Sequence, residues 1–142
     1  MGNVQLNRMI AWSLLIIAGL AAIAGIKPVF DLYDKFWWYD EAVHFFFFFS
    51  ITLVMSLYAY GALLTGRRRH EILLVLTVAG LGLALGTIWE MIEWAYDLGT
   101  PANSIQGKWD TMIDLSIDFG GSALSGILSV VMMNKSRPPR TE

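Results

Sequence analysis

Eight ionisable side chains capable of metal binding or acid–base chemistry recur at helical spacing in three separate segments. They are Asp40 and His44 in the first segment, Glu90, Glu93 and Asp97 in the second, and Asp110, Asp114 and Asp118 in the third. At roughly 100° per residue, each set falls within an arc of about 40–80° on one face of a helix. The sequence therefore predicts three polar helix faces that could meet in a single site.

Carboxylates and imidazoles are the usual protein ligands of divalent cations, and a spare carboxylate can act as a general base. We expect the following ligand set, with the last two residues peripheral: His44, Glu90, Glu93, Asp114, Asp118, Asp40 and Asp110. Glu93 or Asp97 would serve as the catalytic base. Oxygen-rich ligation favours Mg²⁺, Mn²⁺ or Ca²⁺, while the single histidine leaves Zn²⁺ and Fe²⁺ open. The number of carboxylates suits two bridged metal ions.

The elements that carry these residues are apolar enough to cross a membrane. The chain has 142 residues, of which 56 % are hydrophobic and 15 % charged, whereas soluble domains have about 45–50 % and about 25 %. Four segments approach the roughly 20 apolar residues that span a bilayer, and they cover about 9–26, 41–64, 72–97 and 112–133. The expected fold is all-α: an integral membrane four-helix bundle forming one domain over 1–142, with a loose tail at 134–142.

The basic residues predict the topology. Seven of the ten Lys and Arg residues lie in the N-terminal segment, the second connector and the tail, and three lie in the other connectors. Because Lys and Arg stay cytoplasmic, both termini should be cytoplasmic in a multi-pass cell-membrane protein, with the acidic faces outside. A cleaved signal peptide ending near Ala22-Ile23-Ala24 is the alternative for the first span. Gly82 and Gly86 have the small-residue spacing of close helix contacts, as do Gly121, Ser125 and Ser129, with a hinge as the alternative role.

The acidic faces lack an obvious counter-charge, since no Arg and only three connector lysines share the expected outer side. Buried carboxylates are costly unless they are protonated, paired or bound to metal. A bound cation is one solution, and shared protons in a proton- or cation-conducting path are another. A third interpretation assigns these acids no chemical role, because acids at helix ends can be solvated, and Asp110 or Asp114 could cap a helix.

Several functions are excluded by the sequence. There is no Cys for a thiol nucleophile or disulfide framework, and a net charge of −2 argues against nucleic-acid binding. The zincin motif His-Glu-x-x-His and the nucleophile elbow Gly-x-Ser-x-Gly are absent. The expected partner is membrane lipid, and no protein partner is indicated. Five tryptophans are typical of an aromatic belt at one boundary, with a wall around a ligand as the alternative: Trp37, Trp38, Trp89, Trp94 and Trp109.

Three segments carry a family resemblance: Trp38-Tyr-Asp-Glu-Ala-Val-His44, Trp89-Glu-Met-Ile-Glu-Trp94, and the stretch from Trp109 to Gly121. Together they resemble the YjdF-like bacterial inner-membrane proteins and, more distantly, the VanZ-like membrane proteins. The resemblance implies a multi-pass helical bundle and highlights the same acidic residues, without supplying a reaction.

These features predict a metal-dependent hydrolase or transferase that acts on a lipid headgroup or a lipid-linked envelope precursor. A metal ion at headgroup depth could activate water for attack on a phosphoryl or ester group. One alternative is a transporter or channel component that uses the acidic cluster for cations or protons. The other is a structural or partner-binding membrane protein without catalysis.

Overall fold

The chain is described by a computed structural model that covers residues 3–26, 29–63, 68–101, 104–105 and 107–135. The helices are α1 (Asn3–Gly25), α2 (Leu32–Lys35), α3 (Tyr39–Leu63), α4 (Arg68–Gly99) and α5 (Lys108–Lys135). The described residues contain no strand, and the four long helices are each apolar enough to cross a membrane. The all-α fold with four candidate spans is thus confirmed, while the predicted tail lies outside the described residues from position 136 onward.

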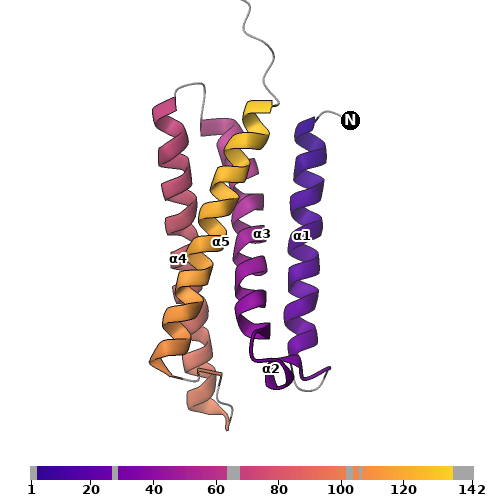
Figure 1. Cartoon of the computed structure of the whole chain (residues 1–142), viewed down its shortest axis with the longest axis vertical. Coiled ribbons are helices and arrows are strands. Elements are labelled where there is room, and N and C mark those ends of the chain that lie inside the picture. Colours follow the sequence, from indigo (N-terminus) through magenta and orange to yellow (C-terminus); the bar gives the residue numbers. More distant parts are fainter. Residues whose placement is uncertain (1–2, 27–28, 64–67, 102–103, 106, 136–142) are drawn as a thin grey trace, which may run out of the picture.

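The long helices run alternately up and down (Figure 1). Helix α1 begins and α5 ends at one end of the bundle, and α2 lies at the other. We call these the opposite end and the α2 end. Helix α5 packs against both α3 and α4, and α1 packs mainly against α3. Within the described residues α1 and α4 do not contact each other, so the lateral order is α1, α3, α5, α4.

Small residues let α5 approach its two neighbours closely. A Cβ atom added to Gly121 would lie 2.9 Å from the Phe45 carbonyl oxygen, and one added to Gly126 would lie 3.1 Å from Val75 Cα. A Cβ added to Gly82 would overlap the Ser122 side chain. These contacts agree with the predicted role of the small-residue spacing, because helices in a membrane associate through close backbone packing.

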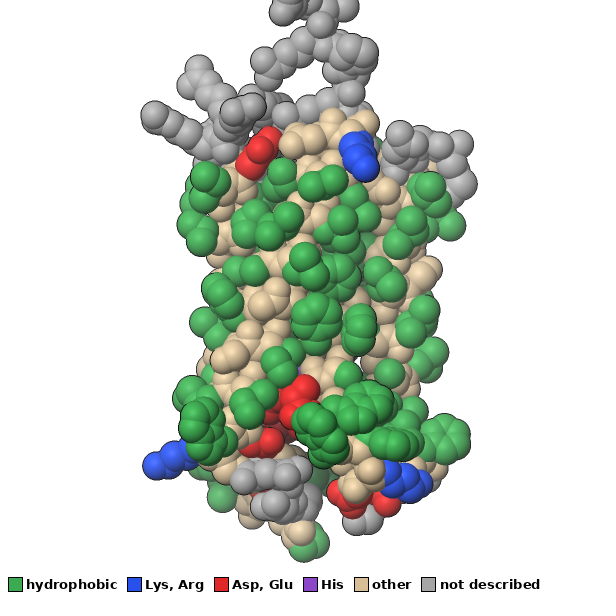
Figure 2. All heavy atoms as spheres, in the orientation of Figure 1, with side chains coloured by type: hydrophobic (Ala, Val, Ile, Leu, Met, Phe, Trp, Pro, Cys, Tyr) green, Lys and Arg blue, Asp and Glu red, His purple; other side chains and the backbone are tan. Residues whose placement is uncertain are grey.

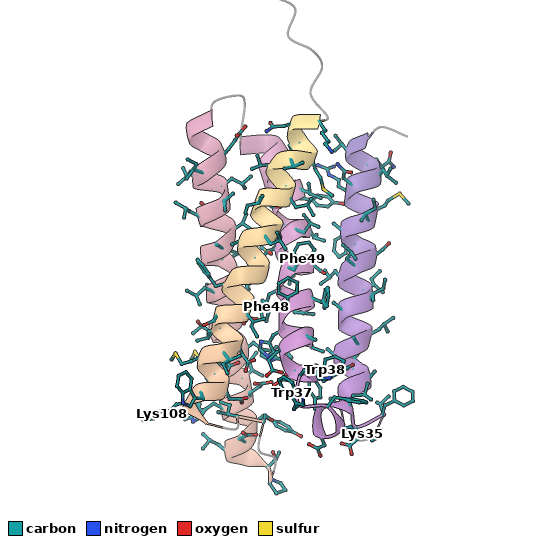
Figure 3. All side chains as sticks on the ribbon, in the orientation of Figure 1. Lys35, Trp37, Trp38, Phe48, Phe49 and Lys108 are labelled. Carbon is teal, nitrogen blue, oxygen red and sulfur yellow. The ribbon has the colours of Figure 1, made fainter. Side chains whose placement is uncertain are left out.

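The two clusters of buried apolar residues lie in the half of the bundle near the opposite end. One buried cluster comprises Ala11, Leu53, Val54 and Leu57, and a second comprises Leu74 and Val78. Many large apolar side chains instead point outward, Ile16, Ile17 and Leu20 among them, as expected for helices in contact with lipid. The interior of the other half holds the buried ionisable residues His44, Glu90, Asp114 and Asp118, and Figure 3 shows side-chain oxygens toward this end.

Candidate functional site

His44 lies among the buried ionisable residues in the half of the bundle near the α2 end. It belongs to the second turn of α3 and is only 3 % exposed. Its Nδ1 atom lies 3.0 Å from Asp118 Oδ1 on α5, and its Nε2 atom lies 3.8 Å from Asp40 Oδ1, one turn earlier on α3. The imidazole is therefore held between two carboxylates from two helices.

Two groups of potential metal ligands share His44. The first joins it with Asp40 and Asp114, and the second joins it with Glu90 and Glu93. In each group one ligand atom per residue lies within 4.8 Å of the others. Ligand atoms around one cation, at about 2.0–2.6 Å from it, fall within such a distance of each other. The polar faces of α3, α4 and α5 thus converge, and Figure 2 shows acidic side chains between apolar ones toward the α2 end.

Three carboxylates at this site are deeply buried. Glu90 is 6 % exposed, Asp114 3 % and Asp118 0 %. Of these three, Asp118 forms an ion pair with His44, and within the described part of the chain none of the three pairs with Lys or Arg. The Lys35 ammonium in α2 donates to the Phe30 carbonyl oxygen at 2.6 Å. Among the described residues, the histidine is therefore the only side chain able to carry a positive charge that pairs with these carboxylates.

Two carboxylate oxygens at the site are buried without a hydrogen-bond partner. These are Glu90 Oε1 and Asp118 Oδ2. Buried polar atoms are normally satisfied, and each exception needs an explanation such as a bound ion or water. The unsatisfied oxygens are consistent with a site that takes a further ligand.

A glycine on α4 makes room for Asp118. A Cβ atom added at Gly86 would overlap the Asp118 carboxylate and approach Asp118 Cβ to 3.2 Å. The glycine therefore has a second role besides helix packing, because it allows a carboxylate of α5 to lie against the α4 backbone.

Three of the predicted site residues lie outside the two ligand groups. Asp118 is the hydrogen-bond partner of His44, and Asp110 is in the first turn of α5. The two oxygens of Asp97 accept backbone N–H groups of Ser104 and Ile105, each at 3.0 Å. Asp97 thus fixes the connector between α4 and α5, a role that its helical spacing with Glu90 and Glu93 does not reveal.

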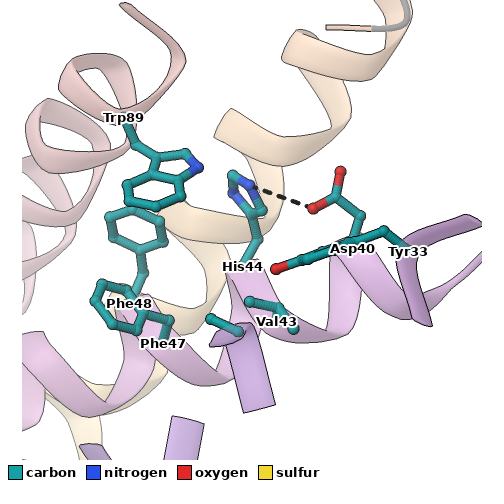
Figure 4. Close-up of a pocket in the computed structure, with 8 residues that line it drawn as sticks. Tyr33, Asp40, Val43, His44, Phe47, Phe48 and Trp89 are labelled. Atoms are coloured by element: carbon teal, nitrogen blue, oxygen red, sulfur yellow. Dashed lines mark ion pairs between the residues drawn. The ribbon is translucent and has the colours of Figure 1, made fainter. Parts of the chain in front are cut away.

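A cavity of about 30 Å³ adjoins His44 on the side facing α1. It is lined by Ala22, Tyr33, Asp40, Val43, His44, Phe47, Phe48 and Trp89 (Figure 4). The Trp89 indole N–H donates to Glu93 Oε1 at 2.9 Å. Sequence reasoning assigned Trp89 to an aromatic belt and did not single out Tyr33, whose position in a short connector helix carries no periodic signal.

The interface of α3 with α5 also contains a row of buried hydroxyl groups, which we call the hydroxyl row: Thr52, Ser56, Ser125 and Ser129. Thr52 and Ser125 are hydrogen-bonded through their hydroxyls at 2.8 Å, and Ser56 is hydrogen-bonded to Ser129. The small-residue spacing of Gly121, Ser125 and Ser129 predicts the α5 side of this row as a close helix contact. On α3, the four-residue spacing from His44 through Phe48 to Thr52 and Ser56 is a signal that could have identified the other side.

Comparison with known proteins agrees with the membrane character of the chain. Searches of the curated proteins and of the solved structures found no match. A family described as predicted membrane protein (DUF2238) matches residues 1–135, which confirms the resemblance to a membrane-protein family. On this match, the chain belongs to the DUF2238 family of predicted membrane proteins.

Proposed function

We propose that the convergence of α3, α4 and α5 forms a divalent-cation site that acts on phosphate- or ester-containing lipid headgroups. The observation that carries the proposal is the pairing of His44 Nδ1 with the fully buried Asp118, at 3.0 Å, beside two groups of carboxylates. A metal-binding histidine almost always donates its other ring N–H to a carboxylate, carbonyl or water, which fixes its tautomer and orientation.

In this proposal His44 contributes Nε2 to the cation, because Nδ1 is occupied by Asp118. One ring nitrogen can bind only one ion, so the two groups surround a single shared position. The other ligands of that ion would be chosen from Asp40, Asp114, Glu90 and Glu93. Asp118 acts as the positioning residue of His44, and Asp110 remains peripheral. A second ion would need carboxylates alone. Oxygen-rich ligation with one imidazole suits Mg²⁺, Mn²⁺ or Ca²⁺ and is compatible with Zn²⁺ and Fe²⁺.

A cation at this position would supply Lewis-acid stabilisation of a phosphoryl or carbonyl oxygen and acidify water. Of the two bases predicted from the sequence, Glu93 is the better candidate, because it belongs to a His44 group. Asp97 already accepts two backbone N–H groups. The Trp89 N–H orients Glu93 Oε1 and leaves Oε2 for a proton. The charge distribution predicts that the α2 end faces outward in the cell membrane.

The decisive experiment is elemental analysis of the protein purified in mild detergent without chelator. We expect near-stoichiometric divalent metal in the wild type and a loss of about 10–100-fold in affinity in Asp118→Asn, the magnitude typical of removing an outer partner. Ser129→Ala, which removes a buried polar side chain from the same helix, is the matched control and should keep its metal. A wild-type protein without metal, even after incubation with each candidate cation, would refute the proposal.

A further inference from the structure

The cavity beside His44 has an unusual wall for a site near carboxylates. Four of its lining residues are aromatic (Tyr33, Phe47, Phe48 and Trp89), and they come from α2, α3 and α4. In the view of Figure 4, the Tyr33 hydroxyl points toward His44, while Phe47, Phe48 and Trp89 lie on the other side. Asp40 supplies the carboxylate of the lining.

Aromatic faces combined with a carboxylate recognise alkylammonium groups. The faces of Trp, Tyr and Phe attract a cation through the ring quadrupole, with a stronger effect when the cation is desolvated. A divalent metal ion requires several oxygen ligands, and most of this wall offers none. An ammonium group needs fewer oxygens because its remaining charge is spread over N–H and C–H groups that can face the rings.

The Tyr33 side chain in this wall is held in position by its neighbours and stays uncharged. The Tyr33 ring lies against the end of α1, where a Cβ atom on Gly25 would overlap it. It also packs edge-on against the Tyr39 ring, with 5.2 Å between the two ring centroids. Tyr39 in turn donates its hydroxyl to the Ala21 carbonyl oxygen at 2.7 Å. Burial, with a contribution from Asp40, raises the pKa of the Tyr33 phenol well above its usual value, so it remains an uncharged ring and donor.

The cavity is small and only partly enclosed. Its volume of about 30 Å³ exceeds the roughly 10–15 Å³ that one water molecule occupies on the same measure. This suits a primary ammonium with its first methylene better than a trimethylammonium group. The cavity spans the interval between α1 and α4, which do not contact each other within the described residues, and Trp89 at its border is 39 % exposed.

We propose that this cavity binds the primary ammonium group of an aminoalkyl phosphate, with the phosphate directed to the cation position at His44. The ammonium half stands on the cavity alone, and only the phosphate half rests on the proposed function. The shared chemistry is an ethanolamine-phosphate unit, which a membrane lipid or a free phosphate ester could carry.

The test is equilibrium dialysis, which measures the affinity of the full chain in detergent for phosphoethanolamine, phosphocholine and glycerol phosphate. The buffer contains the metal that elemental analysis identifies or, if none is found, Mg²⁺. We expect phosphoethanolamine to bind at least about tenfold more tightly than the other two. A parallel arm incorporates the protein in nanodiscs of mixed phosphatidylethanolamine and phosphatidylglycerol and measures retained lipid by native mass spectrometry. Enrichment of phosphatidylethanolamine identifies the lipid as the source, and binding of the free ester alone identifies the soluble one.

Ala22→Leu fills the cavity from α1 without altering any proposed metal ligand, and Gly19→Leu is the control on the same helix, where a Cβ meets nothing within 4 Å. Ala22→Leu should lose the preference for phosphoethanolamine and keep its metal content. Tyr33→Leu, which removes a ring outside the long helices, should do the same. Equal binding of the three esters to the wild type, or unchanged selectivity in both variants, overturns the proposal.

The two proposals fail separately in this design. A metal-free wild type that still prefers phosphoethanolamine over glycerol phosphate supports the ammonium cavity and refutes the cation site. A metal-loaded wild type without that preference does the reverse.

Discussion

The interface between α3 and α5 has two polar halves that are built from different groups. Toward the α2 end, His44 of α3 meets Asp118 of α5 at 3.0 Å. In the other half, the hydroxyl row joins the same helices through Thr52 with Ser125 and Ser56 with Ser129. The side chains that make these contacts are all buried, so the difference between the two contacts is one of chemistry and not of solvent access.

The hydroxyl row satisfies itself. Thr52 donates to the Phe48 carbonyl oxygen at 2.5 Å, and Ser129 donates to that of Ser125 at 2.7 Å. Each hydroxyl offers one donor and two acceptor positions, and the bonds along and between the helices use them well. Such a row is an ordinary means of joining membrane helices.

The carboxylate half does not satisfy itself. Glu90 Oε1 and Asp118 Oδ2 lack partners, as does the hydroxyl of Ser122 at the boundary between the halves. An unsatisfied buried carboxylate oxygen costs more than an unsatisfied hydroxyl, because it belongs to an ionisable group. The comparison teaches that one half of the interface serves packing, whereas the other half is organised for a ligand.

The largest expected effect is on metal binding in His44→Ala. Because His44 is common to both ligand groups, its removal should lower metal affinity by more than the roughly 100-fold seen for outer partners. Thr52→Ala, two turns away on the same helix, should bind metal like the wild type. Isothermal titration of the chelator-treated proteins measures both, and equal affinities would abolish the distinction between the halves.

Metal removal gives the next largest effect. A ligand at about 100 times its Kd stabilises the folded protein by about 2.7 kcal/mol, so chelation should lower the free energy of unfolding in mixed micelles by that amount. The loss should be absent in His44→Ala and unchanged in Ser56→Ala. A chelator effect of equal size in His44→Ala would locate the metal elsewhere.

Gly86→Ala should disturb the carboxylate half through packing. The added methyl overlaps Asp118, and overpacking of this kind costs about 1–3 kcal/mol. Gly80→Ala is the matched control on α4, since a Cβ there meets nothing within 4 Å. Unfolding by detergent titration should separate the two variants, and metal affinity should fall only in Gly86→Ala. Indistinguishable variants would show that Gly86 does not hold Asp118 in place.

The smallest effect is expected in the hydroxyl row. A double-mutant cycle of Ser56→Ala and Ser129→Ala should give a coupling energy of about 0.6 kcal/mol, the average for hydrogen bonds between membrane helices. Metal content should not change in either variant. A coupling of several kcal/mol, or any loss of metal, would mean that the hydroxyl row belongs to the site.

The polar faces of the candidate site could be predicted from the sequence, but the roles of their members could not. The spacing of Glu90, Glu93 and Asp97 places them on one face of α4, yet Asp97 extends past the bundle and binds the connector instead. Tyr33 was not predicted because α2 has only four residues, too few to show a period. Its position depends on a contact with the end of α1.

The sequence by itself determined four long apolar helices and the small residues between them. It also determined which face of α3, α4 and α5 carries the acidic residues. These properties follow from hydropathy and from the 3.6-residue period, both of which are local. Only the tertiary structure decided that Asp118 pairs with His44, that Gly86 receives the Asp118 carboxylate, and that Tyr33 closes a cavity beside them. Such contacts depend on the rotation and axial offset of neighbouring helices, which no period within a single helix encodes.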